Sequence, residues 1–297
     1  MTTTIEEGVR AYLQEHISAT EWHLHIPERG FSPARRFIAR SAERAVFVKL
    51  GADERILLRL SDAKLTPRLL AGGPFGNTRI TVQEFVEGQH PTRQWYEANA
   101  HVWARMMQRL SQVAELRAFL PQPGDETYQS LWRRYIGQVQ AIYDRSRLQA
   151  HEQQVVEALL SSYSSRLPFV QGAGLVPVHG DPGPDNLLIS SSGVLLVDWD
   201  NLHLSEPMRD AALVAWWMYP PSRWQELLRP FHIDLSDPSH QERFYFYISV
   251  WSLEVALFFA NLQHRKWKEY FLRDAERAWQ RRPPERLLID EDRIARG

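Results

Sequence analysis

The chain contains the stretch Val178-His179-Gly180-Asp181-Pro182-Gly183-Pro184-Asp185-Asn186-Leu187-Leu188-Ile189, followed by Val194-Leu195-Leu196-Val197-Asp198-Trp199-Asp200. Short apolar runs flank a loop that holds Asp181 and Asn186, and Asp198 ends the next apolar run. Phosphoryl transfer from a nucleotide needs such a set. One carboxylate orients and deprotonates the attacking hydroxyl, while a second carboxylate and an amide oxygen hold magnesium on the phosphates. Asp181 is therefore the candidate base, and Asn186 and Asp198 are the candidate metal ligands.

The pattern His-Gly-Asp, four residues, Asn, and then Asp-Trp resembles the catalytic signature of the aminoglycoside phosphotransferase and choline kinase-like family. The resemblance covers nearly the whole chain and is strongest over residues 176–212. It implies an α+β, protein-kinase-like fold of two lobes. The small, mostly antiparallel β lobe at residues 1–87 would bind the nucleotide. The larger helical lobe at residues 88–297 would carry the catalytic loop and the substrate pocket.

The resemblance also implies nucleotide contacts in the first lobe. It places the nucleotide lysine on the strand that contains Lys49, and the hinge backbone that meets adenine at Gln83, Glu84, Phe85 and Val86. The nearest glutamate that could pair with Lys49 is Glu54, only five residues further on. The run Gly30-Phe31-Ser32-Pro33-Ala34 predicts a tight turn whose backbone donors can lie over phosphates, so Ser32 is a further candidate. An ordinary turn is the alternative.

Three more residues lie near the motif, and the resemblance suggests roles for two of them. His179 corresponds to a histidine that organises the catalytic loop, and Asp210 to a helix aspartate that anchors the loop through backbone hydrogen bonds. Asp200 has two interpretations: it reaches an amine or the metal shell, or it caps the turn at residues 201–205.

Apolar periodicity predicts the elements around the motif. Residues 36–40 and 45–50 indicate a hairpin, and residues 66–71 and 79–86 two further strands around a Gly72-Gly73-Pro74 loop. Apolar residues recur every three or four positions from Thr92, which predicts a long capped helix. Further helices are expected at residues 53–60, 129–146, 151–166, 207–219, 242–263 and 266–282.

The substrate pocket is expected among the tryptophan-rich helices after residue 200. Trp251 and Glu254 could hold an organic cation through a cation–π contact beside a carboxylate. The alternative is core packing, with Glu254 paired to an arginine. Arginine is abundant beyond residue 265, and its positive charge would repel a polycationic substrate. An uncharged or singly charged alcohol is therefore an equally good candidate substrate.

The composition restricts the class of partner. With 35 basic and 36 acidic residues and a net charge of −1, the chain has no general electrostatic reason to bind nucleic acid or an anionic membrane. It contains no cysteine, which excludes disulfides and thiolate metal sites. Residues 1–10 lack the basic start and apolar core of a signal peptide. Residues 244–262 are membrane-like in composition but carry Glu254, which favours a buried core helix. We expect a cytoplasmic protein, and the oligomeric state stays open.

These observations predict an enzyme that uses ATP, or alternatively GTP, together with Mg²⁺. The acceptor would be a hydroxyl group of a small molecule: an aminoglycoside-like or other antibiotic, an amino alcohol or a sugar. The first alternative is a catalytically silent nucleotide-binding regulatory protein of the same fold, against which the presence of a base beside the metal ligands argues. A protein kinase ranks lower, because the short span from Asp198 to Pro207 leaves little room for an activation segment.

Overall fold

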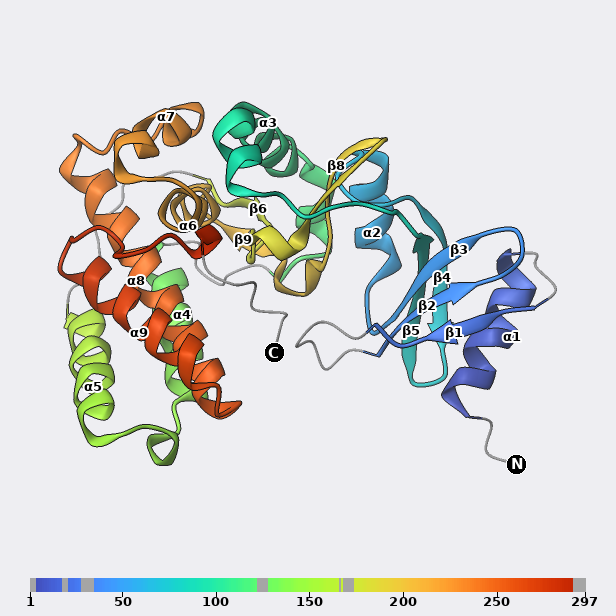
Figure 1. Ribbon diagram of the computed structural model, residues 1–297, viewed down its shortest axis with the longest axis horizontal. Helices are drawn as coiled ribbons and strands as arrows, with labels where there is room; N and C mark the ends of the chain where they lie inside the picture. Colours follow the sequence, from blue (N-terminus) through green and yellow to red (C-terminus); the bar gives the residue numbers. More distant parts are fainter. Residues whose placement is uncertain are drawn as a thin grey trace. The chain divides into compact units, whose positions relative to one another are not determined.

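The computed structural model describes residues 4–17, 21–27, 35–121, 128–165, 167 and 174–290. The chain forms two compact units (Figure 1). The first unit holds the described residues between 4 and 91 together with Asp185–Asp200, and the second holds those between 92 and 184 and between 201 and 290. The sequence predicts two lobes, at residues 1–87 and 88–297, which would place residues 185–200 in the second lobe. In the structure these residues belong to the first unit. The segment that contains two of the candidate metal ligands therefore folds as part of the first unit.

The first unit is built on a five-stranded antiparallel sheet in the order β1-β2-β3-β5-β4. Its elements are α1 (Ile5–Ile17), β1 (His23–His25), β2 (Arg36–Arg40), β3 (Ala45–Leu50), α2 (Glu54–Asp62), β4 (Leu69–Phe75) and β5 (Thr78–Glu84). The predicted hairpin at residues 36–40 and 45–50 is confirmed as β2 and β3. The predicted helix at residues 53–60 is α2, and Asp53 caps it by accepting a hydrogen bond from the Arg55 N–H at 2.9 Å.

One face of this sheet forms the core of the first unit. Successive strand residues point to opposite faces, and the buried side chains on one face pack against α1. This core contains Val9, Leu13 and Ile17 of α1 with Phe37, Ala39, Val46, Val48, Leu50, Ile80 and Val82 of the sheet. The strand residues that alternate with these core residues, including Arg36 and Lys49, therefore lie on the opposite face of the sheet.

The predicted loop at Gly72-Gly73-Pro74 is wrong, because β4 runs through these residues to Phe75. Proline has no N–H to donate to a neighbouring strand. Because β4 is an edge strand, one of its sides has no neighbour, and Pro74 is tolerated there. A Cβ on Gly72 would lie 2.4 Å from the Cβ of Glu54. The glycine thus allows α2 to pack closely on the strand, and the turn falls at Gly76, with φ +57°.

A second hairpin belongs to the same unit. It consists of β7 (Leu187–Ser190) and β8 (Gly193–Leu196), which pair antiparallel with Leu187 opposite Leu196. The Leu196 N–H donates to the Leu65 carbonyl at 2.8 Å. An isolated bridge joins Gln89 and Ile189. These backbone contacts fix the hairpin to the chain around α2 and β5.

The second unit is mostly helical. Its main elements are α3 (Arg93–Ser111), α4 (Tyr128–Ile142), α5 (Ala150–Ser165), α6 (Met208–Met218), α7 (Trp224–Leu228), α8 (Pro238–Asn261) and α9 (Arg265–Trp279), with a two-stranded sheet of β6 (Val176–Val178) and β9 (His203–Ser205). The side chains of α6 are all buried, as expected of a helix surrounded by others. Thr92 caps α3 as predicted, accepting from the Trp95 N–H at 3.3 Å.

Helix α8 is the predicted core helix around Glu254. By length and composition alone it could cross a membrane, but 67% of its most apolar window is buried inside the protein. It packs beside α4, α6 and α9. The helix begins earlier than predicted because Asp237 caps it, accepting from the Ser239 N–H at 2.7 Å. Pro238 then occupies the first helical position, where a missing N–H costs nothing.

Candidate functional site

The candidate metal ligands lie together at the open end of the β7–β8 ladder. The Val197 N–H donates to the Asn186 carbonyl at 2.9 Å, one step beyond the last paired residues of the ladder. This bond extends the antiparallel pairing, so Asn186 and Asp198 leave the hairpin next to each other. The backbone of Asn186 is thus paired with the residue that precedes Asp198, and both candidate ligands belong to the first unit.

Asp198 is the centre of a charged cluster. Its Oδ1 accepts from the Nζ of Lys49 at 2.9 Å, and its Oδ2 lies 3.9 Å from the Nη1 of Arg36. Lys49 Nζ also donates to Asp200 Oδ1 at 2.5 Å. Asp198 has φ +62°, in the left-handed region that a non-glycine residue adopts at some cost. Such backbone strain gathers at ligand-binding and catalytic sites.

The loop that holds Asp198 is fixed from two sides. The Trp199 Nε1–H donates to Thr66 Oγ1 at 3.0 Å, directly after α2. On the other side, a ring nitrogen of His90 lies 3.0 Å from the Leu187 carbonyl. These contacts tie the segment from Leu187 to Trp199 to residues that are far from it in the sequence.

Glu54 is not the partner of Lys49, and this expectation is wrong. Its carboxylate instead accepts from the Nε of Arg79 at 2.5 Å and from Arg79 Nη2. Helix α2 begins only five residues after Lys49, at Glu54 itself, and the strand β5 places Arg79 beside this first turn. Among the described residues, the carboxylates bonded to Lys49 are Asp198 and Asp200.

The predicted hinge residues follow the end of β5. The Gln83 side chain is buried and donates to the Pro67 carbonyl at 2.9 Å and to Thr66 Oγ1 at 3.3 Å. The backbone N–H groups of Glu84 and Phe85 donate to Arg68 and Ala45, respectively. Within the described residues, the next N–H, of Val86, has no hydrogen-bond partner. Ser32 lies outside the described residues.

The sheet face opposite α1 changes character along its length. Its β2 and β3 residues pair across the ladder as Arg36 with Lys49, Ile38 with Phe47, and Arg40 with Ala45. The Arg40 guanidinium lies 5.1 Å from the centre of the Phe85 ring. At about 3.3 Å per residue, the four steps from Lys49 to Ala45 cover ~13 Å. One end of the strip is cationic, its middle is apolar and partly exposed, and the hinge lies at its other end.

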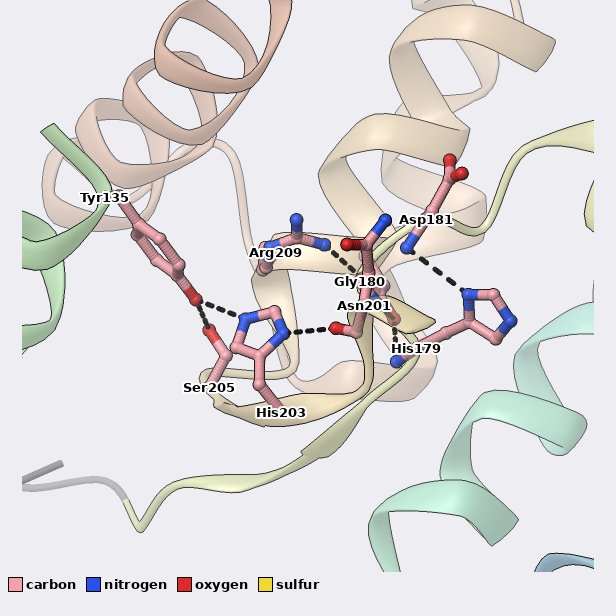
Figure 2. A network of polar contacts seen from close by, with 9 residues as sticks. Tyr135, His179, Gly180, Asp181, Asn201, His203, Ser205 and Arg209 are labelled. Atoms are coloured by element: carbon pink, nitrogen blue, oxygen red, sulfur yellow. Dashed lines mark hydrogen bonds and ion pairs between the residues drawn. The ribbon is translucent and has the colours of Figure 1, made fainter. Parts of the chain in front are cut away.

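Asp181 belongs to the second unit, on the loop after β6 (Figure 2). The Asp210 carboxylate accepts from the His179 N–H at 2.7 Å and from the Gly180 N–H at 3.2 Å. The Asp181 N–H donates to His179 Nδ1 at 3.2 Å. Figure 2 shows the Asp181 carboxylate pointing away from the His179 ring. The predicted anchoring role of Asp210 and the loop-organising role of His179 are confirmed by these bonds.

Gly180 is required by the shape of this loop. It has φ +87°, and a Cβ at this position would lie 2.1 Å from the Asn201 carbonyl oxygen. Any side chain would therefore clash with a backbone atom and be strained. The close approach of Asn201 places the chain after Asp200 against the residue before Asp181.

A chain of polar contacts leads from Asn201 through His203 to Tyr135. A ring nitrogen of His203, Nδ1, lies 2.6 Å from the Asn201 carbonyl, and Nε2 lies 2.6 Å from the Tyr135 hydroxyl. Only Nδ1–H can donate to the carbonyl, so Nε2 accepts the Tyr135 proton and the imidazole is neutral. Burial lowers the pKa of His203 to about 3, in agreement with this assignment, and the nearby Arg209 acts in the same direction. The Ser205 hydroxyl oxygen lies 2.9 Å from that of Tyr135.

The two aromatic and acidic substrate candidates lie on α8. The Arg209 guanidinium lies 4.2 Å from the Trp251 ring centre and is bonded to Asp210 at 2.9 Å. One face of Trp251 is thus covered by a cation of the protein. Burial raises the pKa of Glu254, and the positive charge of Arg209 opposes this effect.

The oxygen donors fit a Mg²⁺ ion better than a softer metal. Asn186 and Asp198 provide an amide and a carboxylate, and Mg²⁺ is usually held by one or two carboxylates with phosphate and water oxygens. Within the described ranges, no group of three or more His, Cys, Asp or Glu side chains is placed to hold a metal alone. The site therefore suits a metal that arrives with a phosphate ligand.

Sequence reasoning missed Arg36, although the register of the predicted hairpin already places it opposite Lys49. It also missed Tyr135 and His203, which are 68 residues apart and carry no local signal of their contact.

An antiparallel sheet with a cation and a carboxylate on one face, joined to a helical unit that anchors a His-Gly-Asp loop, defines the protein-kinase-like small-molecule phosphotransferases. The model of the phosphotransferase enzyme family matches residues 13–247, and the chain belongs to this family.

Solved structures share the fold over most of the chain. Spectinomycin phosphotransferase, crystallised with ADP and spectinomycin, is 16% identical, with a TM-score of 0.65 over 94% of this chain and 100% of that one. The choline kinase LicA from Streptococcus pneumoniae is 16% identical, with a TM-score of 0.65 over 94% and 98% of the two chains. A putative aminoglycoside phosphotransferase from Ralstonia eutropha is 14% identical, with a TM-score of 0.66 over 93% and 97%. The predicted α+β kinase-like fold is confirmed. No curated protein matches the chain.

Proposed function

We propose that the protein transfers the γ-phosphate of ATP to a hydroxyl group of a small molecule. The observation that carries this proposal is the bond from Lys49, on a nucleotide-sized strip of the sheet, to Asp198. Asp181, on a loop fixed through Asp210, supplies the base. GTP is the alternative donor. The proposed hinge contacts to the base are made by backbone groups, so the residue types at the hinge do not distinguish adenine from guanine.

In this proposal the first lobe, residues 1–87, binds the nucleotide. The base lies over the apolar middle of the strip, against the backbone of Gln83 to Val86, and the phosphates lie at Lys49. The unpaired N–H of Val86 supports a hydrogen bond to the base. Ser32 is a further proposed phosphate contact.

Asn186 and Asp198 would hold Mg²⁺. When bound, the ion neutralises negative charge on the phosphate oxygens as the transferred group moves. Asp198 and Asp200 already balance the charge of Lys49, so Lys49 is held in place before the nucleotide arrives. We place Asp200 at the phosphate side of the site, where it restrains the lysine.

Asp181 would act on the acceptor in the second lobe, residues 88–297. The acceptor oxygen forms a bond to the γ-phosphorus, the bond from that phosphorus to the bridging oxygen breaks, and a carboxylate oxygen of Asp181 takes the hydroxyl proton. Since phosphoryl transfer states are loose, orientation of the hydroxyl is the larger part of this role. The bonds from Asp210 and His179 hold the loop rigid for this purpose.

The acceptor class is an alcohol: an aminoglycoside-like or other antibiotic, an amino alcohol or a sugar. Trp251 and Glu254 are the proposed substrate contacts. Because Arg209 covers one face of Trp251, a substrate can stack only on the other face. This arrangement favours an uncharged or singly charged alcohol over a polycation. We place the reaction in the cytoplasm, where the nucleotide is abundant.

The test is a screen of hydroxyl compounds for ADP release, with antibiotics, amino alcohols and sugars side by side and with ATP and GTP as donors. At least one compound should stimulate ADP release in the wild type, while the isosteric Asp181→Asn variant should stay at background. Nucleotide binding without any compound-dependent release, across all classes, would instead favour the silent regulatory protein.

A further inference from the structure

A second cation lies beside Lys49 on the phosphate end of the sheet. Arg36 is the first residue of β2 and is directly opposite Lys49 of β3 in the antiparallel register. Opposite residues of such a pair project from the same face, with their Cβ atoms about 4.5–5.5 Å apart. The neighbouring residues Phe37 and Val48 are buried in the α1 core. Arg36 and Lys49 therefore form a pair on the face proposed to bind the nucleotide.

The two cations share one carboxylate. Lys49 is 2.9 Å from Oδ1 of Asp198, and Arg36 is 3.9 Å from Oδ2. The Arg36 side chain is only 15% exposed. A distance of 3.9 Å is too long for a hydrogen bond, and within the described residues the Arg36 guanidinium makes none. Its donors are thus held close to the phosphate end of the site while they remain unused.

We propose that Arg36 is a second phosphate-binding residue, which donates to the phosphate oxygens of the nucleotide next to Lys49. The inference rests on the proposed function. A guanidinium presents planar, paired donors that match phosphate oxygens. The partly buried position strengthens this interaction relative to one in bulk water. When the phosphates bind, Arg36 exchanges its long contact with Asp198 for direct hydrogen bonds.

The competing role is structural: Arg36 would only neutralise Asp198. The two roles differ when Asp198 is already neutral. In an Asp198→Asn background, an arginine that merely balances the carboxylate has nothing left to balance, whereas one that binds phosphate still contributes. The comparison is a double-mutant cycle, which isolates the direct term.

The experiment is calorimetric titration of ATP and of adenosine, without Mg²⁺, into the wild type, Arg36→Met, Asp198→Asn and the double variant. Arg36→Met should weaken ATP binding about 10- to 100-fold in both backgrounds, the usual cost of a lost charge-assisted hydrogen bond. Adenosine affinity should stay unchanged, since it has no phosphate. Unchanged adenosine affinity also shows that the variant is folded.

Arg35→Met is the matched control. Arg35 is exposed and, among the described residues, forms no ion pair. Its loss removes the same charge one position away and should change ATP affinity by less than about twofold. Equal ATP affinities for Asp198→Asn and the double variant would overturn the inference, as would an equal effect of Arg35→Met. A wild type that binds ATP neither with nor without Mg²⁺ would overturn the proposed function together with the inference, whereas a wild type that binds ATP and is insensitive to Arg36→Met overturns the inference alone.

Discussion

The two units use charged groups in different ways. In the first unit, Lys49 pairs with Asp198 and Asp200, whose side chains are 32% and 43% exposed. In the second, the Asp210 side chain is only 3% exposed and accepts from the backbone of His179 and Gly180. In the first set the carboxylates are partly exposed, while the Lys49 side chain is only 9% exposed. The second is buried and satisfied by the protein itself.

This difference separates binding from positioning. The carboxylates of Asp198 and Asp200 are partly exposed, so a ligand can reach them and compete for their contacts with Lys49. A buried and fully bonded network is expensive to break. Substitutions in the first unit should therefore alter affinity, and substitutions around the loop of Asp181 should alter turnover and stability.

The largest effect is expected from Asp181→Asn, which keeps the shape of the side chain but removes its basicity. Turnover should fall about 10²- to 10⁴-fold, while the ATP dissociation constant changes less than about twofold. Steady-state kinetics and calorimetry on the same preparation measure both. Substantial remaining turnover would remove Asp181 from the role of base.

Next comes Lys49→Met, which should weaken ATP binding about 10- to 100-fold by removing a charge-assisted phosphate contact. Arg79→Met is its matched control, because Arg79 is a cation of the same unit that pairs with Glu54. That change should leave ATP affinity intact. If both variants lost affinity equally, the special position of Lys49 would be refuted.

A smaller effect is expected from Gly180→Ala, which sharpens the comparison from the side of the second unit. The left-handed backbone and the clash with Asn201 should lower the free energy of unfolding by about 1–3 kcal/mol. Thermal unfolding measures the loss, and turnover should fall because the loop shifts. Gly193→Ala, also at positive φ but with open space around it, should lower turnover far less. Equal losses of turnover would contradict the account.

A further prediction concerns the pH dependence of stability. Burial raises the pKa of Asp274 on α9 to about 7. The indoles of Trp216 and Trp217 only partly offset this, since within the described residues neither makes a well-formed hydrogen bond. The folded state therefore keeps a proton that the unfolded state loses near pH 4. This contribution is complete below pH 4 and is lost as the pH rises through about 7, by at most about 1.4 kcal/mol per unit.

The variant Asp274→Asn mimics the protonated acid and should flatten this decline. Urea unfolding between pH 4 and 8 measures the slope. His203, with its pKa lowered to about 3, has the opposite sign: its contribution is complete above about pH 6.5 and is lost as the pH falls toward 3. A wild type and a variant with the same slope would contradict the assignment of Asp274.

Sequence reasoning succeeded where local pattern determines structure. The β2–β3 hairpin follows from alternation around a four-residue turn, and Thr92 caps α3 as expected. The strand through Gly72 could not be predicted, because only the close approach of Glu54 explains a glycine there. The partners of Lys49 are also long-range. Asp198 and Asp200 follow it by 149 and 151 residues, and only the folded hairpin brings them together.

The most direct test of the separation between binding and chemistry is ATP titration, with and without Mg²⁺, into Asp181→Asn and Asp198→Asn in parallel. The account predicts that Mg²⁺ tightens ATP binding to Asp181→Asn as it does in the wild type. It predicts that this tightening disappears in Asp198→Asn. An intact Mg²⁺ effect in Asp198→Asn, or its loss in Asp181→Asn, would contradict the assignment of metal binding to the first unit and of the base to the second.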